Sequence, residues 1–289
     1  MILKDIIPPI LSRWLKNTLK LADNKEYKSY SQAIEACSTD AYLNIELCNM
    51  IADKTVIHTR NLMEKPFVLN PTNVFLLSAL NQYIINYSKR DLTIFDFGGA
   101  CGTHYFKINR FRPKDVTLKW FVVETPQMVK SAHEKGIGNK ELIFISSLKD
   151  IKTNIDIIHS SCALHYVPDP YEIISMLISI KADWILFNRM MFNENDRDFV
   201  TVQKSFLLAN GPGRLPIGYA DKIISYPHTT LSFQKFNSFF TRNDYEIDWI
   251  FDELSGRYQI KREKIIGKEM LYTNKKCRDS AELNLQTNK

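Results

Sequence analysis

The sequence is poor in glycine. It has 10 glycines in 289 residues, against a usual frequency of roughly 7%. Three of these ten, Gly98, Gly99 and Gly102, nevertheless fall within five positions. Because glycine leaves the backbone without a side chain, this cluster indicates a tight turn or a ligand that approaches the main chain closely.

Cysteines and long apolar runs are also scarce. The five cysteines form no C-x-x-C pair, and an odd, scattered set predicts no disulfide framework and favours the reducing cytoplasm. No run approaches the eighteen apolar residues of a membrane span, so we expect no transmembrane helix. Lys4, Asp5 and Pro8–Pro9 interrupt the apolar start and argue against a signal peptide.

The positive charge is concentrated at the C-terminal end. The formal net charge is +6. Residues 261–289 carry 8 basic and 4 acidic side chains, whereas residues 1–260 carry 30 basic and 28 acidic ones. This distribution argues against a nucleic-acid-binding body, and it leaves residues 275–289 as a basic tail exposed to solvent.

The first ninety residues predict a helical cap or lid. Residues 30–56 and 71–89 have helical patterns, and Asn70 before Pro71 resembles an N-cap with proline in the first turn. Residues 9–21 place their apolar side chains on one helical face. Such a face packs on its own domain or makes a weak peripheral contact with a membrane surface.

Residues 91–274 predict a Rossmann-like α/β domain. Short apolar runs alternate there with segments long enough for crossover helices, as in a doubly wound, mostly parallel sheet covered on both sides. A helix over Phe233–Asn243 leads into Tyr245–Phe251. We expect a closing antiparallel pair from Tyr258–Ile266 and Glu269–Thr273. The apolar runs are Leu92–Phe97, Leu118–Val123, Leu142–Ile145, Ile155–His159 and Trp184–Phe187.

The glycine cluster fits one of three loop patterns. A P-loop ends in G-K-[S/T], but Thr103 follows Gly102 with no lysine. The dinucleotide pattern G-x-G-x-x-G, begun at Gly98, meets Ala100 and Thr103 instead of glycine. The pattern acidic-x-G-x-G-x-G matches Asp96, Gly98 and Gly102, with only the middle glycine replaced, by alanine.

Glu124 stands 22 residues beyond Gly102, at the end of the apolar run WFVVE. A carboxylate there can accept hydrogen bonds from both hydroxyls of a ribose. The alternative is a charge at the start of the helix that follows Thr125 and Pro126. With the glycine loop upstream, we favour the ligand-binding role.

This loop together with Glu124 resembles class I S-adenosylmethionine-dependent methyltransferases. More narrowly, the chain resembles a family of methyltransferases associated with bacterial polysaccharide biosynthesis. It departs at Ala100, and at Ser146–Ser147, where many relatives place an acid near the adenine. The resembling pieces are DFGGACGTHYF (96–106), WFVVETPQMV (120–129), DIIHSSCALHYVPDP (156–170), ILFNR (185–189), FVTVQ (199–203) and SYPH (225–228).

The resemblance implies S-adenosylmethionine as cofactor, a small polar acceptor such as a sugar or sugar nucleotide, and a set of binding residues. Gln203 and Tyr226, together with Tyr166, are expected to bind the acceptor. The expected cofactor-binding residues are Asp96, Gly98, Gly99, Ala100, Gly102, Glu124, Thr125, Ser147, Ser160 and Ser161.

Three residues are candidates for catalysis. His165 is either a general base or a residue that fixes the following turn, and His104 either faces the substrate or caps local backbone. Arg189, at the end of a strand, either holds an anionic group or pairs with an acid such as Asp196. The neutral Ser160–Cys162 segment argues against a metal. The competing functions are a nicotinamide-dependent oxidoreductase and a non-catalytic cofactor-binding or interaction module.

Overall fold

The structure is a computed structural model. It describes residues 25–37, 44–64, 69–147, 149, 151, 153–260 and 263–278. The amphipathic segment 9–21 and the part of the basic tail after residue 278 lie outside the described residues, so their expected roles stay predictions.

Three helices precede the sheet. The expected helix over 30–56 is two helices, α2 (Tyr30–Glu35) and α3 (Ile45–Glu64). Helix α4 (Pro71–Tyr87) begins where the sequence predicts, because the Asn70 side chain accepts a hydrogen bond from the Asn73 N–H at 2.9 Å.

The sheet has a Rossmann-like order, which confirms the expected fold class. Its five parallel strands run in the order β3-β2-β1-β4-β5, and β9 continues the sheet antiparallel to β5. Apolar runs predicted four of these strands to within one residue at their starts, whereas β4 begins two residues later than expected. The parallel strands are β1 (Asp91–Phe97), β2 (Thr117–Val123), β3 (Leu142–Ile145), β4 (Ile157–Ser161) and β5 (Trp184–Asn193).

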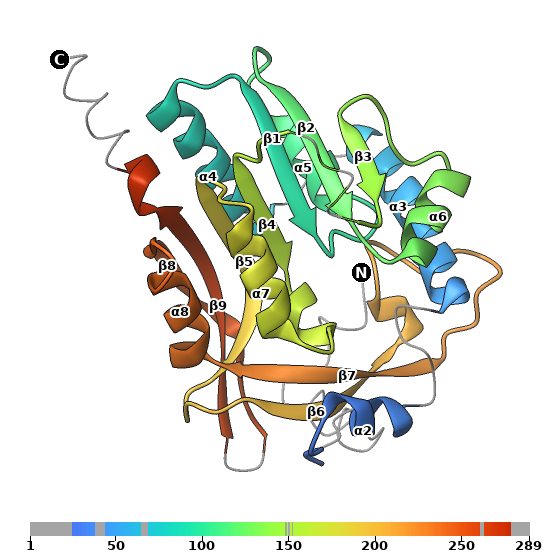
Figure 1. Ribbon diagram of the computed structural model, residues 1–289. Helices are drawn as coiled ribbons and strands as arrows, with labels where there is room; N and C mark the ends of the chain where they lie inside the picture. Colours follow the sequence, from blue (N-terminus) through green and yellow to red (C-terminus); the bar gives the residue numbers. More distant parts are fainter. Residues whose placement is uncertain are drawn as a thin grey trace.

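Helices cover both faces of this sheet. On one face α3 and α4 pack with α5 (Thr103–Phe111) and α6 (Pro126–Glu134), and their apolar side chains share one core with alternate strand residues. On the other face, toward the viewer in Figure 1, α7 (Pro170–Ser179) and α8 (Phe233–Thr241) build a second core. Because α3 and α4 contribute to the first core, they are part of the layered domain's packing.

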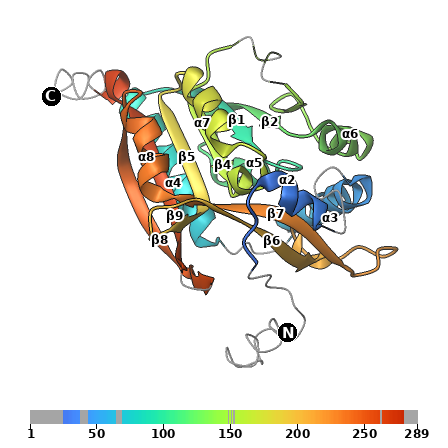
Figure 2. The same ribbon diagram turned by 60° about the horizontal axis from the view of Figure 1, so that its bottom comes forward.

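An antiparallel ribbon lies across the carboxyl ends of the parallel strands (Figures 1 and 2). It consists of β6 (Phe199–Phe206) and β7 (Ile223–Ser232), and α2 packs against both strands. The ribbon joins the main sheet only where Phe192 and Asn193 of β5 pair with the end of β7. This ribbon was not expected as a pair of strands, and it closes the space above the sheet edge.

The closing antiparallel pair is longer than the sequence predicts. Strand β8 (Tyr245–Ile260) pairs with β9 (Glu263–Asn274), so the expected pairing of Tyr258–Ile266 with Glu269–Thr273 is wrong. Ile260 of β8 pairs with Glu263 of β9, so the two strands already face each other within the first expected segment. Its register comes from side chains that β9 packs into the second core, which a local pattern does not reveal.

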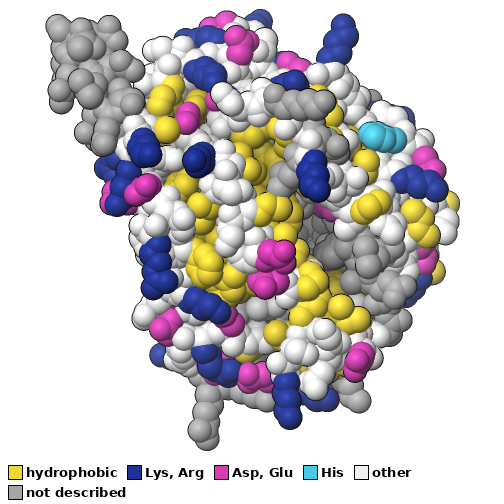
Figure 3. All heavy atoms as spheres, viewed as in Figure 1, with side chains coloured by type: hydrophobic (Ala, Val, Ile, Leu, Met, Phe, Trp, Pro, Cys, Tyr) yellow, Lys and Arg dark blue, Asp and Glu magenta, His cyan; other side chains and the backbone are white. Residues whose placement is uncertain are grey.

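Charges of both signs are distributed over the surface. Lys275 and Arg278, which lie in the described part of the basic tail, pair with Glu246 of β8 at 2.9 Å and 3.6 Å. On the face seen in Figure 3, basic and acidic side chains are interspersed rather than gathered in one basic patch. Within the described ranges, the search for helices both long and apolar enough to cross a bilayer found none.

Candidate active site

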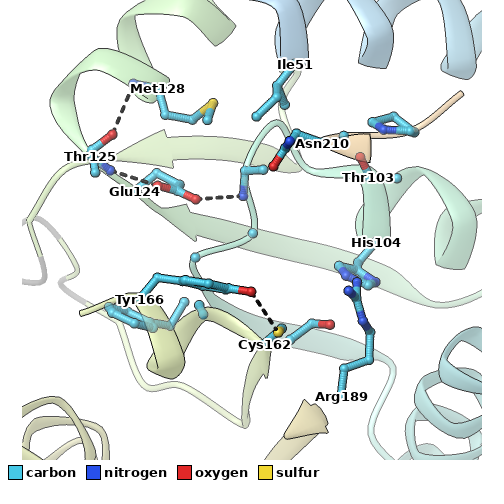
Figure 4. Close-up of a pocket in the computed structure, with 18 of the residues that line it drawn as sticks. Ile51, Thr103, His104, Glu124, Thr125, Met128, Cys162, Tyr166, Arg189 and Asn210 are labelled. Carbon is cyan, nitrogen blue, oxygen red and sulfur yellow. Dashed lines mark hydrogen bonds between the residues drawn. The ribbon is translucent and has the colours of Figure 1, made fainter. Parts of the chain in front are cut away.

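A cavity of about 660 Å³ lies between the carboxyl ends of β1, β2, β4 and β5 and the β6–β7 ribbon. Figure 4 shows side chains from these elements converging on it. Its volume is within the range of small-molecule sites. Of the residues expected from the sequence, those that line it are Gly98, Gly99, Ala100, His104, Glu124, Thr125, Ser161, Tyr166, Arg189, Gln203 and Tyr226.

The glycine loop brings bare backbone to the cavity wall. Gly98 has a φ of +68°, and a Cβ added there would lie 2.2 Å from the Cβ of Ala163. A Cβ on Gly99 would lie 2.4 Å from a carboxylate oxygen of Asp96. Both positions therefore exclude a side chain, as the sequence argument requires.

Ala100 stands at the middle position of the motif and has a φ of +49°. This left-handed conformation favours glycine, so the departure from the family pattern places a side chain in a strained backbone. The Ala100 N–H donates to Glu124 Oε1 at 3.0 Å, and this bond helps to hold the conformation.

Glu124 joins the end of β2 to the glycine loop. Its second oxygen, Oε2, accepts the Thr125 N–H at 3.0 Å. Burial raises the pKa of Glu124, and the hydrogen bonds from Thr125 and Ala100 act against this rise. Each carboxylate oxygen thus has one backbone donor and retains acceptor capacity toward the cavity, as ribose binding requires.

Asp96 lies beneath the glycine loop rather than on the cavity wall, where a cofactor-binding role had been expected. It is fully buried, and its Oδ1 lies 2.7 Å from His159 Nδ1. Its other oxygen accepts the Trp120 indole N–H at 3.1 Å. Burial alone raises the pKa of Asp96, but the charge and hydrogen bond of His159 outweigh it and lower the pKa.

A chain of buried hydrogen bonds continues from this pair across the sheet. His159 Nε2 lies 2.8 Å from Asn188 Oδ1, so both ring nitrogens face acceptors. Burial acts to lower the pKa of His159, but Asp96 and then Asn188 raise it overall. Asn188 donates to Glu269, which accepts the Thr72 hydroxyl at 2.9 Å. The chain connects the glycine-loop support to the cavity-lining start of α4.

His165 does not reach the cavity, and its geometry argues against the expected role of general base. Its Nδ1–H donates to the carbonyl oxygen of Thr229 at 2.7 Å, and its Nε2 accepts the Met191 N–H at 2.9 Å. Both nitrogens are therefore committed to backbone of distant strands, and not to the turn after His165 that the sequence offered as the alternative. Because Thr229 is in β7 and Met191 in β5, the ring fastens the ribbon to the main sheet.

We expect the free energy of unfolding to fall as the pH decreases from about 6 to about 5. Burial lowers the pKa of His165 to about 4 and that of His228 well below its ordinary value. The two rings stack with centroids 4.8 Å apart. The unfolded chain thus gains two protons at these positions that the folded chain does not, and His104, whose pKa burial lowers to about 3, adds a third. Together the three are worth up to about 4.1 kcal/mol per pH unit. Urea unfolding at several pH values measures this slope.

The matched variant is His228→Phe, which keeps an aromatic ring in the stack and removes one titrating group. Its slope should be shallower by up to about 1.4 kcal/mol per pH unit. His159 adds nothing below about pH 6.5, because its raised pKa leaves it protonated in both states there. A pH-independent free energy of unfolding in the parent protein over this range would contradict the prediction.

His104, in the first turn of α5, lines the cavity. Burial and the neighbouring His159 lower its pKa to about 3, so the ring is neutral at neutral pH. Its Nδ1 is buried with no hydrogen-bond partner among the described residues. In Figure 4 the ring lies beside the Arg189 side chain. Its placement is compatible with the substrate-facing role and not with capping of local backbone.

Arg189 owes its position to an irregularity in β5. Its φ is +56°, and the pairing of β5 with β9 shifts register between Phe187 and Met190. Two residues of β5 thus oppose Glu269 alone, which is a β-bulge. The exposed Arg189 side chain lines the cavity. No ion pair with Asp196 is found; that carboxylate accepts a hydrogen bond from the Ser232 hydroxyl.

The residues expected to bind the acceptor come from three separate elements but lie together. The Tyr166 hydroxyl donates to Gln203 Oε1 at 3.0 Å, and the Tyr166 and Tyr226 rings meet edge to face at 5.2 Å. Tyr226 and Gln203 face each other across the β6–β7 ribbon. The ribbon brings Gln203 and Tyr226 to the cavity.

The remaining expected cofactor residues differ in placement. Ser161 lines the cavity, and its Oγ is buried without a hydrogen-bond partner among the described residues. Ser160 is instead buried and donates to the Phe97 carbonyl at 3.1 Å. Ser146 lines the cavity where Ser147 was expected. Gly102 is the N-cap residue of α5, has a φ of +73° and does not line the cavity.

The sequence did not single out several lining residues from other elements. Asn210 and Gly211 follow β6, and they reach the cavity because the buried Lys54 of α3 donates to the carbonyl oxygens of Leu208 and Asn210. Lys107 lies one turn after His104 on α5, so helical periodicity could have found it. The other residues missed include Ile51, Asn70, Thr72, Asn73, Met128 and Cys162.

Neither a scan against family models nor a search of curated proteins found a match. Among solved structures, the chain is similar to a S-adenosylmethionine-dependent methyltransferase from Clostridium acetobutylicum, at 14% identity and a TM-score of 0.44, over 76% of this chain and 98% of that one. A methyltransferase from Methanosarcina mazei has 14% identity and a TM-score of 0.45, over 72% and 99%.

A third similar structure is an amino pentose methyltransferase of calicheamicin biosynthesis from Micromonospora echinaspora. Its identity is 10% and its TM-score 0.44, over 77% of this chain and 96% of that one. The strand order and register of the chain itself define its class as Rossmann-like α/β.

Proposed function

We propose that the protein is a S-adenosylmethionine-dependent methyltransferase acting on a small polar acceptor. The observation that carries the proposal is the meeting of a side-chain-free loop and the Glu124 carboxylate in one cavity. The two hydroxyls of a ribose can donate hydrogen bonds to the carboxylate, and the rest of the cofactor can lie close to the main chain of the loop.

The residues present fit this cofactor. Glu124 would accept from the ribose hydroxyls, Ser146 lies where the adenine is expected, and Gly98 and Gly99 supply bare backbone. The partnerless Ser161 Oγ offers a polar contact. When bound, the cofactor supplies an activated methyl group attached to a sulfonium.

The contribution of the chain is then mainly to place the acceptor. Tyr166, Gln203 and Tyr226 form one wall of the cavity and orient polar groups toward the strand ends. Such positioning raises effective concentration and supplies much of the acceleration in displacement reactions. His104 is a weak base because its pKa is low, so it suits hydrogen bonding to the acceptor better than full proton removal.

For the acceptor we propose a sugar or sugar nucleotide of polysaccharide biosynthesis, modified in the cytoplasm. The family resemblance supports the sugar, and the polar wall of the cavity is compatible with it. None of the five cysteines, all of which the structure describes, is in a disulfide, and a reducing compartment is compatible with this.

Calorimetry tests the function directly. We expect S-adenosylmethionine and its demethylated product to bind one site per chain, with NADH as the control ligand. Binding of NADH in place of both compounds would favour the oxidoreductase, and binding of none would favour an interaction module. Either result overturns the proposal. If the two compounds bind, a methyl-labelled cofactor with candidate sugar nucleotides identifies the acceptor.

A further inference from the structure

The cavity is electrostatically asymmetric. Of the described residues that line it, Glu124 is the one acidic side chain, and Lys107 and Arg189 are the basic ones. Figure 4 shows Glu124 and Arg189 on opposite sides of the cavity. The side away from Glu124 is therefore cationic.

Lys107 has no ion-pair or hydrogen-bond partner within the described part of the chain. It is half-buried on α5, and its pKa is lowered by burial and then by the charge of Arg189. A partly buried ammonium beside a second cation is unfavourable unless an anion joins them. The described residues therefore supply no counter-charge to the Lys107 ammonium.

Arg189 is held at the cationic side of the cavity by the β-bulge in β5, where its backbone is strained. A side-chain-bearing residue at a φ of +56° is unfavourable, and bulges in strands commonly re-aim a side chain near a site. His104 adds a neutral ring beside Arg189 rather than a negative charge. Carboxylates and phosphates are the groups that a lysine and an arginine together bind best.

We propose that Lys107 and Arg189 form an oxyanion subsite that selects acceptors carrying a carboxylate or a phosphate. The proposal rests on the proposed function, in which Glu124 marks the cofactor side and the cationic side remains for the acceptor. Lys107 is then a specificity-determining residue, and neutral acceptors lack the group that this side of the cavity binds.

The test uses two anions as probes, inorganic pyrophosphate and citrate, each titrated into the protein with and without saturating S-adenosylhomocysteine. Lys107→Met should weaken binding of the preferred anion at least about tenfold, because methionine keeps the apolar stem and removes the charge. Lys107→Arg should retain most of the binding. Lys114→Met, at an exposed site outside the cavity, is the matched control and should bind as the parent does.

Loss of pyrophosphate binding in Lys107→Met identifies a phosphate subsite, and loss of citrate binding a carboxylate subsite. Two results would overturn the proposal: an anion affinity unchanged in Lys107→Met, or no anion binding by the parent protein. A third is a tenfold loss of S-adenosylhomocysteine affinity with anion binding intact, since Lys107 would then serve the cofactor carboxylate. The titrations without S-adenosylhomocysteine remain informative if the protein binds no such cofactor.

Discussion

Asp96→Ala is expected to reduce the free energy of unfolding by about 3–5 kcal/mol, as does removal of one partner of a buried ion pair. The variant leaves His159 Nδ1 and the Trp120 indole N–H, both buried, without their acceptor. Because Gly99 packs against the Asp96 carboxylate, the glycine loop also loses its support. Urea unfolding followed by tryptophan fluorescence measures the loss.

The matched variant is Asp96→Asn, which keeps an acceptor oxygen and removes the charge. It should lose markedly less stability than Asp96→Ala. The ion pair contributes fully to the free energy of unfolding at pH values between the ordinary pKa of a carboxyl group and that of an unfolded imidazole. Its contribution declines as the pH rises through the raised pKa of His159. The cost of Asp96→Ala should therefore be greatest at mildly acid pH. A loss below about 1 kcal/mol there would contradict a buried pair.

Glu124→Ala is expected to weaken the binding of S-adenosylmethionine at least about tenfold, or about 1.4 kcal/mol. The variant removes the acceptor proposed for the ribose. It also frees the Ala100 and Thr125 N–H groups that the carboxylate holds. Calorimetric titration of S-adenosylmethionine and of its demethylated product measures the effect.

Glu134→Ala is the control for Glu124→Ala. Glu134 is an exposed residue of α6 outside the cavity, 3.7 Å from Lys130, so its removal should leave cofactor affinity unchanged. Thermal unfolding of both variants without ligand separates a loss of loop order from a loss of ligand contact. An unchanged affinity in Glu124→Ala would remove Glu124 from the site.

Local patterns in the sequence predict the part of the fold that depends on local properties. Apolar runs locate the parallel strands because a strand buried on both faces needs apolar side chains at every position. Asn70 and Pro71 locate the start of α4 because capping involves neighbouring residues. The glycine cluster located the loop at Gly98 because few other residues fit a φ of +68°.

Contacts between distant segments account for what the sequence did not predict. The role of His165 depends on Thr229 and Met191, which lie in strands 64 and 26 residues away. Asp96 has a motif position typical of cofactor loops, yet its partner His159 is 63 residues further along the chain. Nothing near Gln203 or Tyr226 in the sequence reveals the ribbon that carries them to the cavity, and the family resemblance alone indicated these residues.

Because of the bulge, the number of residues in β5 helps to determine the geometry of the site. Asn188 and Arg189 together occupy the space opposite one residue of β9. Deleting one of the two would restore regular pairing and leave Phe187, Met190 and Phe192 on the same face of the sheet, where they already share the second core. A single residue would then stand opposite Glu269, and it could not supply both the buried Asn188 amide and the exposed Arg189 side chain. The number of residues in β5, and not only their identity, thus decides whether an arginine can face the cavity.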